Sequence, residues 1–372
     1  MEMNTDLHLH SCFSMATSPD MLPERILAGC RIKGIDAVGS GDALHPEWRR
    51  MWEPFLENEF GITVVPQTEV EDSSRVHHVI LAETFDQFAE MQDLFTPACA
   101  HLTTAGRPHL QLSGEEIASV VHAAGAMIGP AHAFTPWTSL FASYTRPSEC
   151  YGEEGFEFCE LGLSADSSYG ASIAEFANVP FLTNSDAHSP TPVKLGREFT
   201  RMEVAGSSPK AVLAAVAAGA VVLNAGFFPE EGKYNRTACT RCYAQFSLAD
   251  AEALHWRCPA DKGRIKLGVR ERAERLSRLA TPTPRPPYVK MIPLAEVIAR
   301  VLGVSSPSTK KCRALYDQFI AAFGTEIAVL LEVPGGELAD VSSGVSDAVL
   351  KMREGRVTLF PGGGGKYGSF AF

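Results

Sequence analysis

Two pairs of polar residues with i, i+2 spacing are the most chemically informative feature of the chain. His8 and His10 lie near the first residue, and Asp186 and His188 repeat the spacing far downstream. Residues two apart on a strand point to the same face, so each pair can present two ligands to one metal ion. Imidazole with carboxylate suits zinc, manganese or iron. A single pair is more often an ordinary buried histidine, so the prediction depends on partners elsewhere.

Further polar side chains lie at the boundaries of other predicted strands. Hydrolysis of a phosphate ester needs an activated water and positive charge beside oxygens that gain negative charge, and clustered cations supply both. A cluster of this kind needs many imidazoles and carboxylates, some of them bridging. The residues that meet this need are His8, His10, Asp42, His45, Glu69, His77 or His78, His132, Asp186 and His188.

Alternating strands and helices must position these residues. Predicted strands cover 3–9, 35–40, 62–68, 75–82, 126–130, 156–163, 180–184 and 221–223, and predicted helices cover 23–33, 85–95, 114–124, 171–178 and 209–219. This order indicates an α/β fold with parallel strands, and its length favours a closed β/α barrel, where chemistry gathers at strand ends. His77 and His78 differ from the other candidates because they begin an apolar run.

Composition excludes several classes of protein. No apolar run is long enough to span a membrane, and no signal peptide is visible, so we expect a cytoplasmic protein. The nine cysteines fit reduced thiols better than a disulfide framework. The net charge of −11 hides a basic segment, since residues 236–290 hold 12 Lys and Arg against 5 Asp and Glu. A small basic module on an acidic body suits local contact with a polyanion.

The chain changes character after about residue 228. Cys239, Cys242, Cys258 and Asp261 have the spacing of a zinc ribbon whose last cysteine is replaced. His255 is an alternative fourth ligand, and a zinc-free remnant is a second alternative. A basic helix is predicted over 262–279, then a proline-rich linker over 281–287 and helices over 294–302, 310–323 and 345–353. Residues 362–368 are expected to form a flexible Gly-rich tail. The expected domains are 1–228, 229–280 and 281–372.

The order of the motifs resembles the polymerase-and-histidinol-phosphatase (PHP) superfamily across residues 1–228. The resemblance implies a distorted seven-stranded β/α barrel with two or three metals. It also favours His77 over His78, because several aliphatic residues and a small one follow the family's histidine. Many members carry an Asp in the segment that residues 13–17 occupy here, so a third metal depends on Asp42 or His45.

The whole chain is similar to the endonuclease Q family. The similarity lies in the barrel, the Cys module, the basic run 262–270 and the local sequences 41–46, 130–137 and 160–166. It implies a DNA repair enzyme that nicks DNA 5′ to uracil, hypoxanthine, xanthine or an abasic site. The implied metal ligands are His8, His10, Asp42, Glu69, His77, His132, Asp186 and His188, with Asp186, His188 and His45 as catalytic residues.

The same resemblance gives the expected DNA contacts. The residues expected to contact phosphates are Lys262, Arg264, Lys266, Arg270 and Arg272. Ser164 and Asn184 are the candidates for reading an extruded base. Damaged DNA is the expected partner, divalent zinc, manganese or magnesium the expected active-site metal, and zinc the structural one. Two other functions stay open: a phosphoesterase for a small metabolite, and a DNA-binding protein that does not cut.

Overall fold

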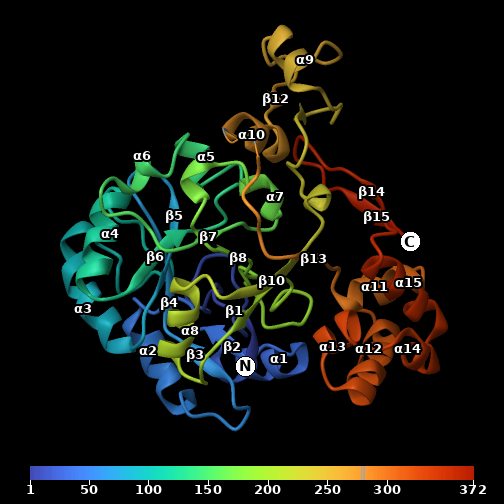
Figure 1. Ribbon diagram of the computed structural model, residues 1–372, viewed down its shortest axis with the longest axis horizontal. Coiled ribbons are helices and arrows are strands. Elements are labelled where there is room, and N and C mark those ends of the chain that lie inside the picture. Colours follow the sequence, from blue (N-terminus) through green and yellow to red (C-terminus); the bar gives the residue numbers. More distant parts are fainter. Residues whose placement is uncertain (278, 280) are drawn as a thin grey trace.

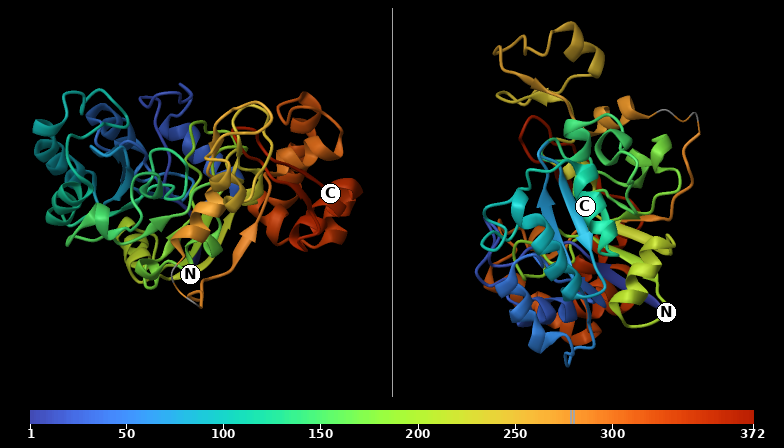
Figure 2. Two further views of the ribbon diagram at one scale, coloured as in Figure 1. Left: turned by 90° about the horizontal axis from the view of Figure 1, so that it is seen from above. Right: turned by 90° about the vertical axis from the view of Figure 1, so that its left-hand side faces the viewer.

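The computed structural model describes residues 1–277, 279 and 281–372. Figure 1 shows an α/β body, a small module that projects from it and a group of C-terminal helices beside it. The module stands clear of the body when the molecule is turned (Figure 2, right). A six-stranded sheet of order β13-β10-β9-β1-β2-β3 forms the centre of the body. Its strands are β1 Glu2–Asp6, β2 Ala37–Gly39, β3 Thr63–Val65, β9 Phe199–Glu203, β10 Val221–Gly226 and β13 Tyr288–Lys290.

Two smaller sheets complete the body. One contains β4 Gln67–Glu71, β5 His77–Leu81 and β6 Met127–Pro130, and the other contains β7 Cys159–Glu160 and β8 Phe181–Leu182. The predicted α/β class is confirmed. The arrangement is consistent with the predicted distorted barrel, but the barrel is not closed, because the described strands of the body fall into three separate sheets.

Strand direction is mixed, whereas the sequence predicted parallel strands. The β1, β2 and β3 strands are parallel, but β4, β5 and β6 pair antiparallel, and β9 is antiparallel to β1 and β10. Only residues 72–76 separate β4 from β5. A connection this short permits a hairpin but no crossover. The start of β5 therefore lies beside the end of β4, which explains why a histidine at a strand start can join residues at strand ends.

Local capping signals determine where several helices begin. Helix α3 Phe85–Phe95 begins after Thr84, and α4 Gly114–Ala123 after Ser113, each with a reciprocal capping box. Helix α1 Pro23–Lys33 ends at Gly34, whose φ of 92° is accessible to glycine. The remaining helices of the body are α2 Pro46–Trp52, α5 Leu140–Ser143, α6 Ser148–Tyr151, α7 Ser167–Gly170 and α8 Pro209–Ala217. No helix in the described part of the chain is long and apolar enough to cross a bilayer.

The helix predicted over residues 171–178 is wrong. Asp166 caps an earlier short helix, α7, by accepting from Ser168 N, and only a 3₁₀ turn, Ala174–Phe176, follows it. The basic helix predicted over 262–279 is also shorter than expected. Its first residues form β12 Ile265–Lys266, and α10 covers only Val269–Leu276. Residue 278 of that prediction, and residue 280 at the expected domain boundary, lie outside the described residues.

The module folds around a small core of its own. Strand β11 Ala238–Cys239 pairs antiparallel with β12, and α9 Leu248–Ala253 packs beside them. Cys239, Ala251, Cys258 and Ile265 are buried together. A core of this size is too small to fold stably without a further constraint, and a structural metal is one of the usual constraints.

The C-terminal helices pack against the body through a buried ion pair. They are α11 Leu294–Val301, α12 Lys310–Phe323, α13 Glu326–Leu331, α14 Gly335–Val341 and α15 Ser343–Arg353. Lys33 Nζ of α1 lies 2.8 Å from Glu326 Oε1, and both side chains are fully buried. Tyr316 donates a hydrogen bond of 2.7 Å to the other oxygen of Glu326. The carboxylate therefore has a cation and a hydroxyl to replace the water it loses.

The Gly-rich tail is ordered, which corrects the expectation of a flexible segment. Strands β14 Thr358–Phe360 and β15 Ser369–Ala371 form an antiparallel hairpin. The loop between them bonds back to the body: Gly362 N donates to Glu230 O and Gly368 N to Glu231 O. These bonds hold the loop in a position where Tyr367 lines the cavity beside His132 and Asp186.

Candidate functional site

The two polar pairs of the sequence lie side by side in the structure. His8 and His10 follow the end of β1, and Asp186 and His188 follow the end of β8. Leu9 and Ala187, the central residues of the two pairs, form a parallel bridge, and His10 N donates to Ala187 O at 3.1 Å. The bridge aligns the pairs, so His10 Nε2 lies 3.2 Å from Asp186 Oδ1.

The antiparallel hairpin contributes the second half of the site. Glu69 of β4 is fully buried, and its Oε1 lies 3.0 Å from His77 Nδ1 at the start of β5. The same oxygen lies 3.0 Å from His132 Nε2, beyond the end of β6. Its other oxygen lies 3.4 Å from His10 Nε2. Glu69 therefore touches both halves of the site, as a bridging carboxylate must.

Three groups of ligand atoms result. They are His8, His10 and Glu69; His10, Asp186 and His188; and Glu69, His77 and His132, with the atoms of each group within 4.8 Å of one another. His10 and Glu69 each belong to two groups, so the groups adjoin. His8 Nε2, His10 Nε2 and Asp186 Oδ1 are buried without a hydrogen-bond partner among the described residues. Buried polar atoms normally have a hydrogen-bond partner. A divalent cation bound here would instead be coordinated by all three atoms. The donor set suits divalent metal ions.

The charges of the buried carboxylates and imidazoles indicate a site that binds cations. Burial alone would lower the pKa of the His8 imidazole, but the carboxylates around it, Glu160 first, raise that pKa to about 9. Burial alone would raise the pKa of Asp186, but His10 and His8 outweigh it and hold that pKa below its ordinary value. The carboxylates are therefore ionised at neutral pH, and their charge must be balanced by protons or by metal.

Two carboxylates orient the first histidine pair from behind. Glu160 of β7 lies 2.8 Å from His8 Nδ1, which leaves Nε2 directed at the site. Asp42 Oδ1 lies 3.2 Å from His10 Nδ1, and its Oδ2 accepts from Ser11 N and from Ser14 Oγ. Asp42 was predicted as a metal ligand, and the structure places it outside the three groups. A carboxylate in this position fixes the ring and raises the basicity of the ligand.

Three site residues have left-handed backbone. Asp42, His132 and Asp186 have φ values of 39°, 32° and 47°. Non-glycine residues adopt this region at a cost that the surrounding structure must offset, and such residues cluster at functional sites. All three lie two to four residues after the end of a strand, in the loops that follow β2, β6 and β8.

His45 lies away from the ligand groups. It begins α2, where its Nδ1 accepts from Trp48 N at 3.3 Å, and its ring stacks on Phe13 at 4.0 Å between centroids. Burial lowers the pKa of His45, so its imidazole is neutral at pH 7. Within the described residues no ligand group includes it.

The neighbouring histidines His77 and His78 have different surroundings. His77 faces Glu69, whereas His78 faces away, with Nδ1 2.7 Å from Tyr151 Oη and Nε2 3.2 Å from Asp72 Oδ2. Asp72, His78 and Cys150 also form a group of potential ligands. Both ring nitrogens of His78 are already occupied, and a Cβ added to Gly114 would lie 2.6 Å from Cys150 Sγ. The group is a tightly packed hydrogen-bond network.

Substitution should separate these two histidines. We expect His78→Ala to lower the free energy of unfolding by about 2–3 kcal/mol, because it leaves a cavity and removes the partner of the buried atoms Asp72 Oδ2 and Tyr151 Oη. His77→Ala should lower it by about 1 kcal/mol or less, because Glu69 keeps other partners, but should abolish metal-dependent activity. Urea unfolding and an activity assay on both variants test this. Equal loss of stability would contradict the assignment.

A cavity of about 460 Å³ opens above the ligand groups. Its volume lies in the range of roughly 300–1,000 Å³ typical of small-molecule sites. Ser164 and Asn184, the predicted base-reading residues, both line it. Trp137, Tyr234 and Tyr367 also line it, with Trp137 55% and Tyr367 70% exposed. Exposed aromatic rings of this kind are suited to stacking on nucleic-acid bases.

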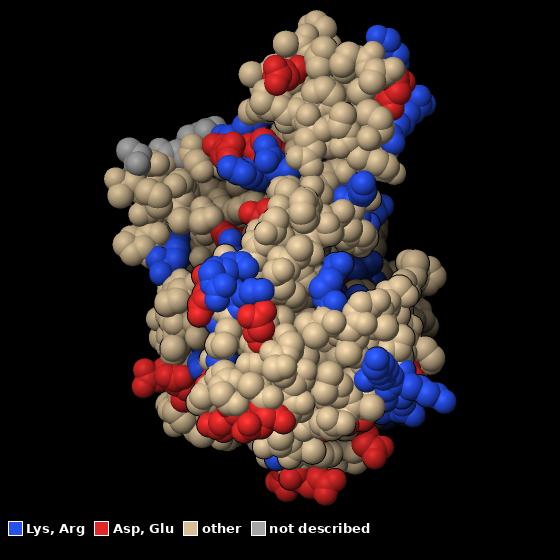
Figure 3. Space-filling view, turned by 90° about the vertical axis from the view of Figure 1, so that its right-hand side faces the viewer, with Lys and Arg blue, Asp and Glu red and all other residues tan. Residues whose placement is uncertain are grey.

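The predicted phosphate-contacting residues divide into two sets. Arg264, Lys266 and Arg272 line one hollow of about 320 Å³ between the module and α10, together with Arg275 and Trp256. Lys266 Nζ also lies 3.4 Å from the centroid of Trp137, so the hollow adjoins the central cavity. Lys262 and Arg270 are not part of it. Arg270 instead pairs with Glu274 on α10. Figure 3 shows basic side chains on the module and at its base, and acidic ones prominent at the opposite end.

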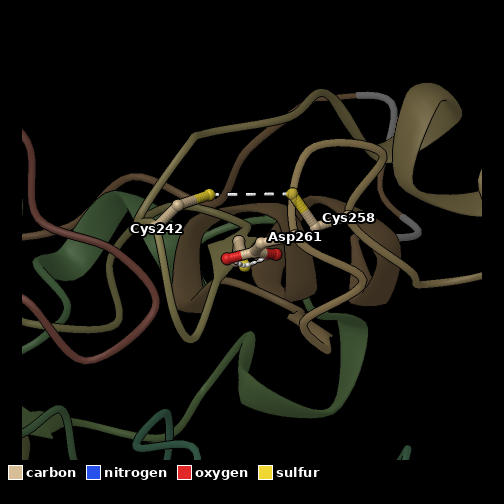
Figure 4. Close-up of side chains that lie close together, drawn as sticks. Cys242, Cys258 and Asp261 are labelled. Carbon is tan, nitrogen blue, oxygen red and sulfur yellow. Dashed lines mark hydrogen bonds between the residues drawn. The ribbon is translucent and has the colours of Figure 1, made fainter.

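The Cys module brings its four predicted ligands together. Cys239 Sγ lies 3.4 Å from Asp261 Oδ1. Cys242 Sγ lies 3.6 Å from Cys258 Sγ, with Asp261 close to both (Figure 4). The atoms of all four lie within 4.8 Å of one another, and His255, the alternative, is not in the group. Three thiols and a carboxylate at this spacing fit a tetrahedral zinc ion.

Several residues of the site escaped the sequence analysis. Glu160 is the last residue of the short strand β7 but belongs to no spaced motif, and the support it gives His8 depends on tertiary contact. Arg107 pairs with Glu69 from a loop without a recognisable pattern. Tyr367 reaches the cavity from the C-terminal hairpin. Of these three residues, only Glu160 could have been recognised from the sequence, because it is a charged residue at the end of an apolar run.

Comparisons with known proteins decide the family. The structure superposes on that of the lesion-specific endonuclease PfuEndoQ from Pyrococcus furiosus with a TM-score of 0.96 and 41% identity, covering 100% of this chain and 96% of that one. The chain belongs to the endonuclease Q family. A structure of endonuclease Q with a 27-mer duplex carrying an abasic lesion at the active site gives a TM-score of 0.94 at 40% identity, over 100% and 97% of the two chains.

Two curated proteins are similar to this endonuclease Q family member in sequence. Protein YqxK of Bacillus subtilis is 30% identical over 400 residues, covering 98% of this chain and 97% of that protein. Protein MJ0043 of Methanocaldococcus jannaschii is 41% identical over 246 residues, which are 64% of this chain but only 31% of that protein. The MJ0043 C-terminal domain model matches residues 293–356, the segment of helices α11 to α15.

Proposed function

We propose that the chain is a metal-dependent endonuclease that nicks DNA on the 5′ side of deaminated bases and abasic sites. The observation that carries the proposal is the set of three adjoining ligand groups at the floor of an aromatic-lined cavity. The family supports it, since one relative is described as lesion-specific and another was solved with an abasic duplex at its active site. Hydrolysis would join a water oxygen to phosphorus and release the 3′-oxygen as a hydroxyl, leaving a 5′-phosphate.

The metal ligands would be the members of the three groups. His8, His10, Glu69, His77, His132, Asp186 and His188 would hold two or three divalent ions, namely zinc, manganese or magnesium. Such ions lower the pKa of water and stabilise charge on phosphate oxygens. Glu160 and Asp42 would fix the imidazoles of His8 and His10. Asp186, partly exposed at the cavity floor, would orient the attacking water, with His188 beside it. The predicted catalytic role of His45 has no support from its position.

Asn184 would read the extruded base. Its Oδ1 accepts from Leu7 N at 2.7 Å, while its buried Nδ2 has no partner in the described part of the chain. It therefore offers the cavity a donor and no acceptor. Deamination converts an exocyclic amino group, which is a donor, into a carbonyl, which is an acceptor. A fixed donor would accept the deaminated base and reject the normal one. Ser164, at the cavity wall, would contribute a second polar contact.

Asn184→Asp tests this assignment, because it keeps the oxygen that accepts from Leu7 and replaces the donor. We expect cleavage at uracil to fall by about 10²-fold, since two acceptors would then face each other. Cleavage at an abasic site should be affected much less, because no base edge is present there. Rates on the two substrates under one set of conditions give the comparison. An equal fall on both would show that Asn184 acts on the metal site instead.

We assign the three expected segments separate tasks within this function. Residues 1–228 would carry the chemistry, 229–280 would bind the DNA backbone around a zinc ion, and 281–372 would support the cavity through Tyr367 and the C-terminal helices. The cations at the base of the module support the second task, because the hollow that they line adjoins the cavity.

A nicking assay tests the proposal. End-labelled duplexes carry one uracil, one hypoxanthine or one abasic site beside an undamaged control, with manganese, magnesium or zinc. We expect one product that ends 5′ to the lesion, no cut in the control and no cut with EDTA. Turnover of p-nitrophenyl phosphate without any DNA cleavage would favour a small-molecule phosphoesterase. DNA binding without cleavage, with every metal tried, would favour a non-cutting DNA-binding protein.

Elemental analysis of the purified protein tests the Cys module, where a lack of zinc would contradict the structural zinc.

A further inference from the structure

We propose that Arg107 contacts the scissile phosphate and stabilises the charge that develops on it during cleavage. This inference rests on the proposed function. Arg107 Nη1 lies 3.0 Å from Glu69 Oε2, at the carboxylate shared by two ligand groups. Its side chain lines the cavity and is 31% exposed, whereas Glu69 is fully buried. Arg107 therefore presents a positive charge to the substrate side of the ligand groups.

Most of the guanidinium is free to bind a ligand. Arginine has five N–H donors in a fixed fork that matches two phosphate oxygens. One of them donates to Glu69, and the others make no hydrogen bond within the described residues. Its charge also acts on Asp186, on the other side of the site. A phosphate bound between the ligand groups and the cavity would lie within reach of the unused donors.

The chain on both sides of Arg107 is held in place. Glu71 N donates to Pro108 O at 3.0 Å and Leu110 N donates to Glu71 O at 2.8 Å, so the segment after Arg107 runs beside β4. Before it, Gly106 approaches the site so closely that an added Cβ would lie 2.4 Å from Asp42 Oδ2. An arginine fixed in this way needs little reorganisation to bind a phosphate, which is the condition for strong electrostatic stabilisation.

The alternative task of Arg107 is only to neutralise Glu69. In that case its loss would change metal binding, and saturating metal would restore the rate. If Arg107 contacts phosphate, its loss lowers the rate at saturating metal and leaves metal affinity nearly unchanged. The two tasks can therefore be separated by measuring both quantities on the same variants.

The experiment uses single-turnover nicking of an abasic duplex at saturating metal. We expect Arg107→Ala to be slower by about 10²- to 10³-fold, and Arg107→Lys to recover only part of this, because lysine keeps the charge without the fork. Added methylguanidinium should partly rescue Arg107→Ala. Arg146→Ala, which removes an exposed cation paired with Glu149 away from the site, is the matched control and should cut at the normal rate.

Three results would overturn the proposal. They are a normal rate for Arg107→Ala, full recovery at higher metal concentration, and lack of rescue by methylguanidinium in a variant that binds metal and DNA normally. The unsubstituted protein is measured in the same series. If it fails to nick the duplex, the proposed function is at fault, and if it nicks as expected while Arg107→Ala does too, only the role of Arg107 is.

Discussion

Asp186→Asn should lower the rate of lesion-specific nicking by about 10³-fold or more, which corresponds to the loss of several kcal/mol of transition-state stabilisation at about 1.4 kcal/mol per tenfold. The carboxylate lies 3.2 Å from His10 Nε2, and the imidazoles of His10 and His8 outweigh burial and keep its pKa low. It is therefore an anion throughout the neutral pH range. Asparagine has nearly the same shape but no charge with which to hold a cation.

Controls separate chemistry from folding in this experiment. Asp186 makes no buried ion pair with a lysine or arginine among the described residues, so the melting temperature of Asp186→Asn should change by only a few degrees. Asp317→Asn removes an exposed carboxylate on α12 and should leave nicking unchanged. A normal rate for Asp186→Asn, with metal bound, would place the chemistry at another site.

Local sequence signals predicted the elements with clear caps or periodicity. The helices over 23–33, 85–95 and 310–323 match α1, α3 and α12. The errors lie where tertiary contact decides. Residues 62–68 were taken as one strand, but they divide into β3 and β4, which belong to different sheets. The antiparallel direction of β5 follows from the length of one turn and not from any residue pattern in the strand.

The candidate site was predictable to the extent that its candidate metal ligands form spaced pairs. His8 and His10, and Asp186 and His188, were recognisable from their shared i, i+2 spacing, and the structure aligns the two pairs through the bridge between Leu9 and Ala187. The residues behind the ligands follow no spacing, since their positions depend on which strands adjoin. No sequence pattern could therefore show that Asp42 lies behind His10 and outside the candidate ligand groups, or that Glu160 contacts His8.

DNA binding should depend steeply on salt concentration. If Lys262, Arg264, Lys266, Arg270 and Arg272 each neutralise a phosphate, the slope of log K against log salt is about −4.5, and affinity falls about 500-fold between roughly 50 and 200 mM salt. Replacing Arg264, Lys266 and Arg272 by Gln should reduce the slope by about 3, so that the same change in salt lowers affinity only about tenfold. Fluorescence anisotropy with an abasic duplex, in the Asp186→Asn background, measures binding without cleavage.

The slope of log K against log salt depends on the position of the lost cations as well as on their number. The whole chain carries a net charge of −11, so any three lost cations make it more acidic and weaken long-range attraction to DNA. Replacing Lys310, Lys311 and Arg313, which are exposed on α12, by Gln makes the same change of charge away from the module. Counterion release requires close contact with phosphates, so this control should keep the normal slope.

Equal slopes for the two triple variants would show that DNA does not follow the basic hollow at the base of the module. A reduced slope for the first variant alone would place the DNA backbone against Arg264, Lys266 and Arg272, next to the cavity that Lys266 and Trp137 border.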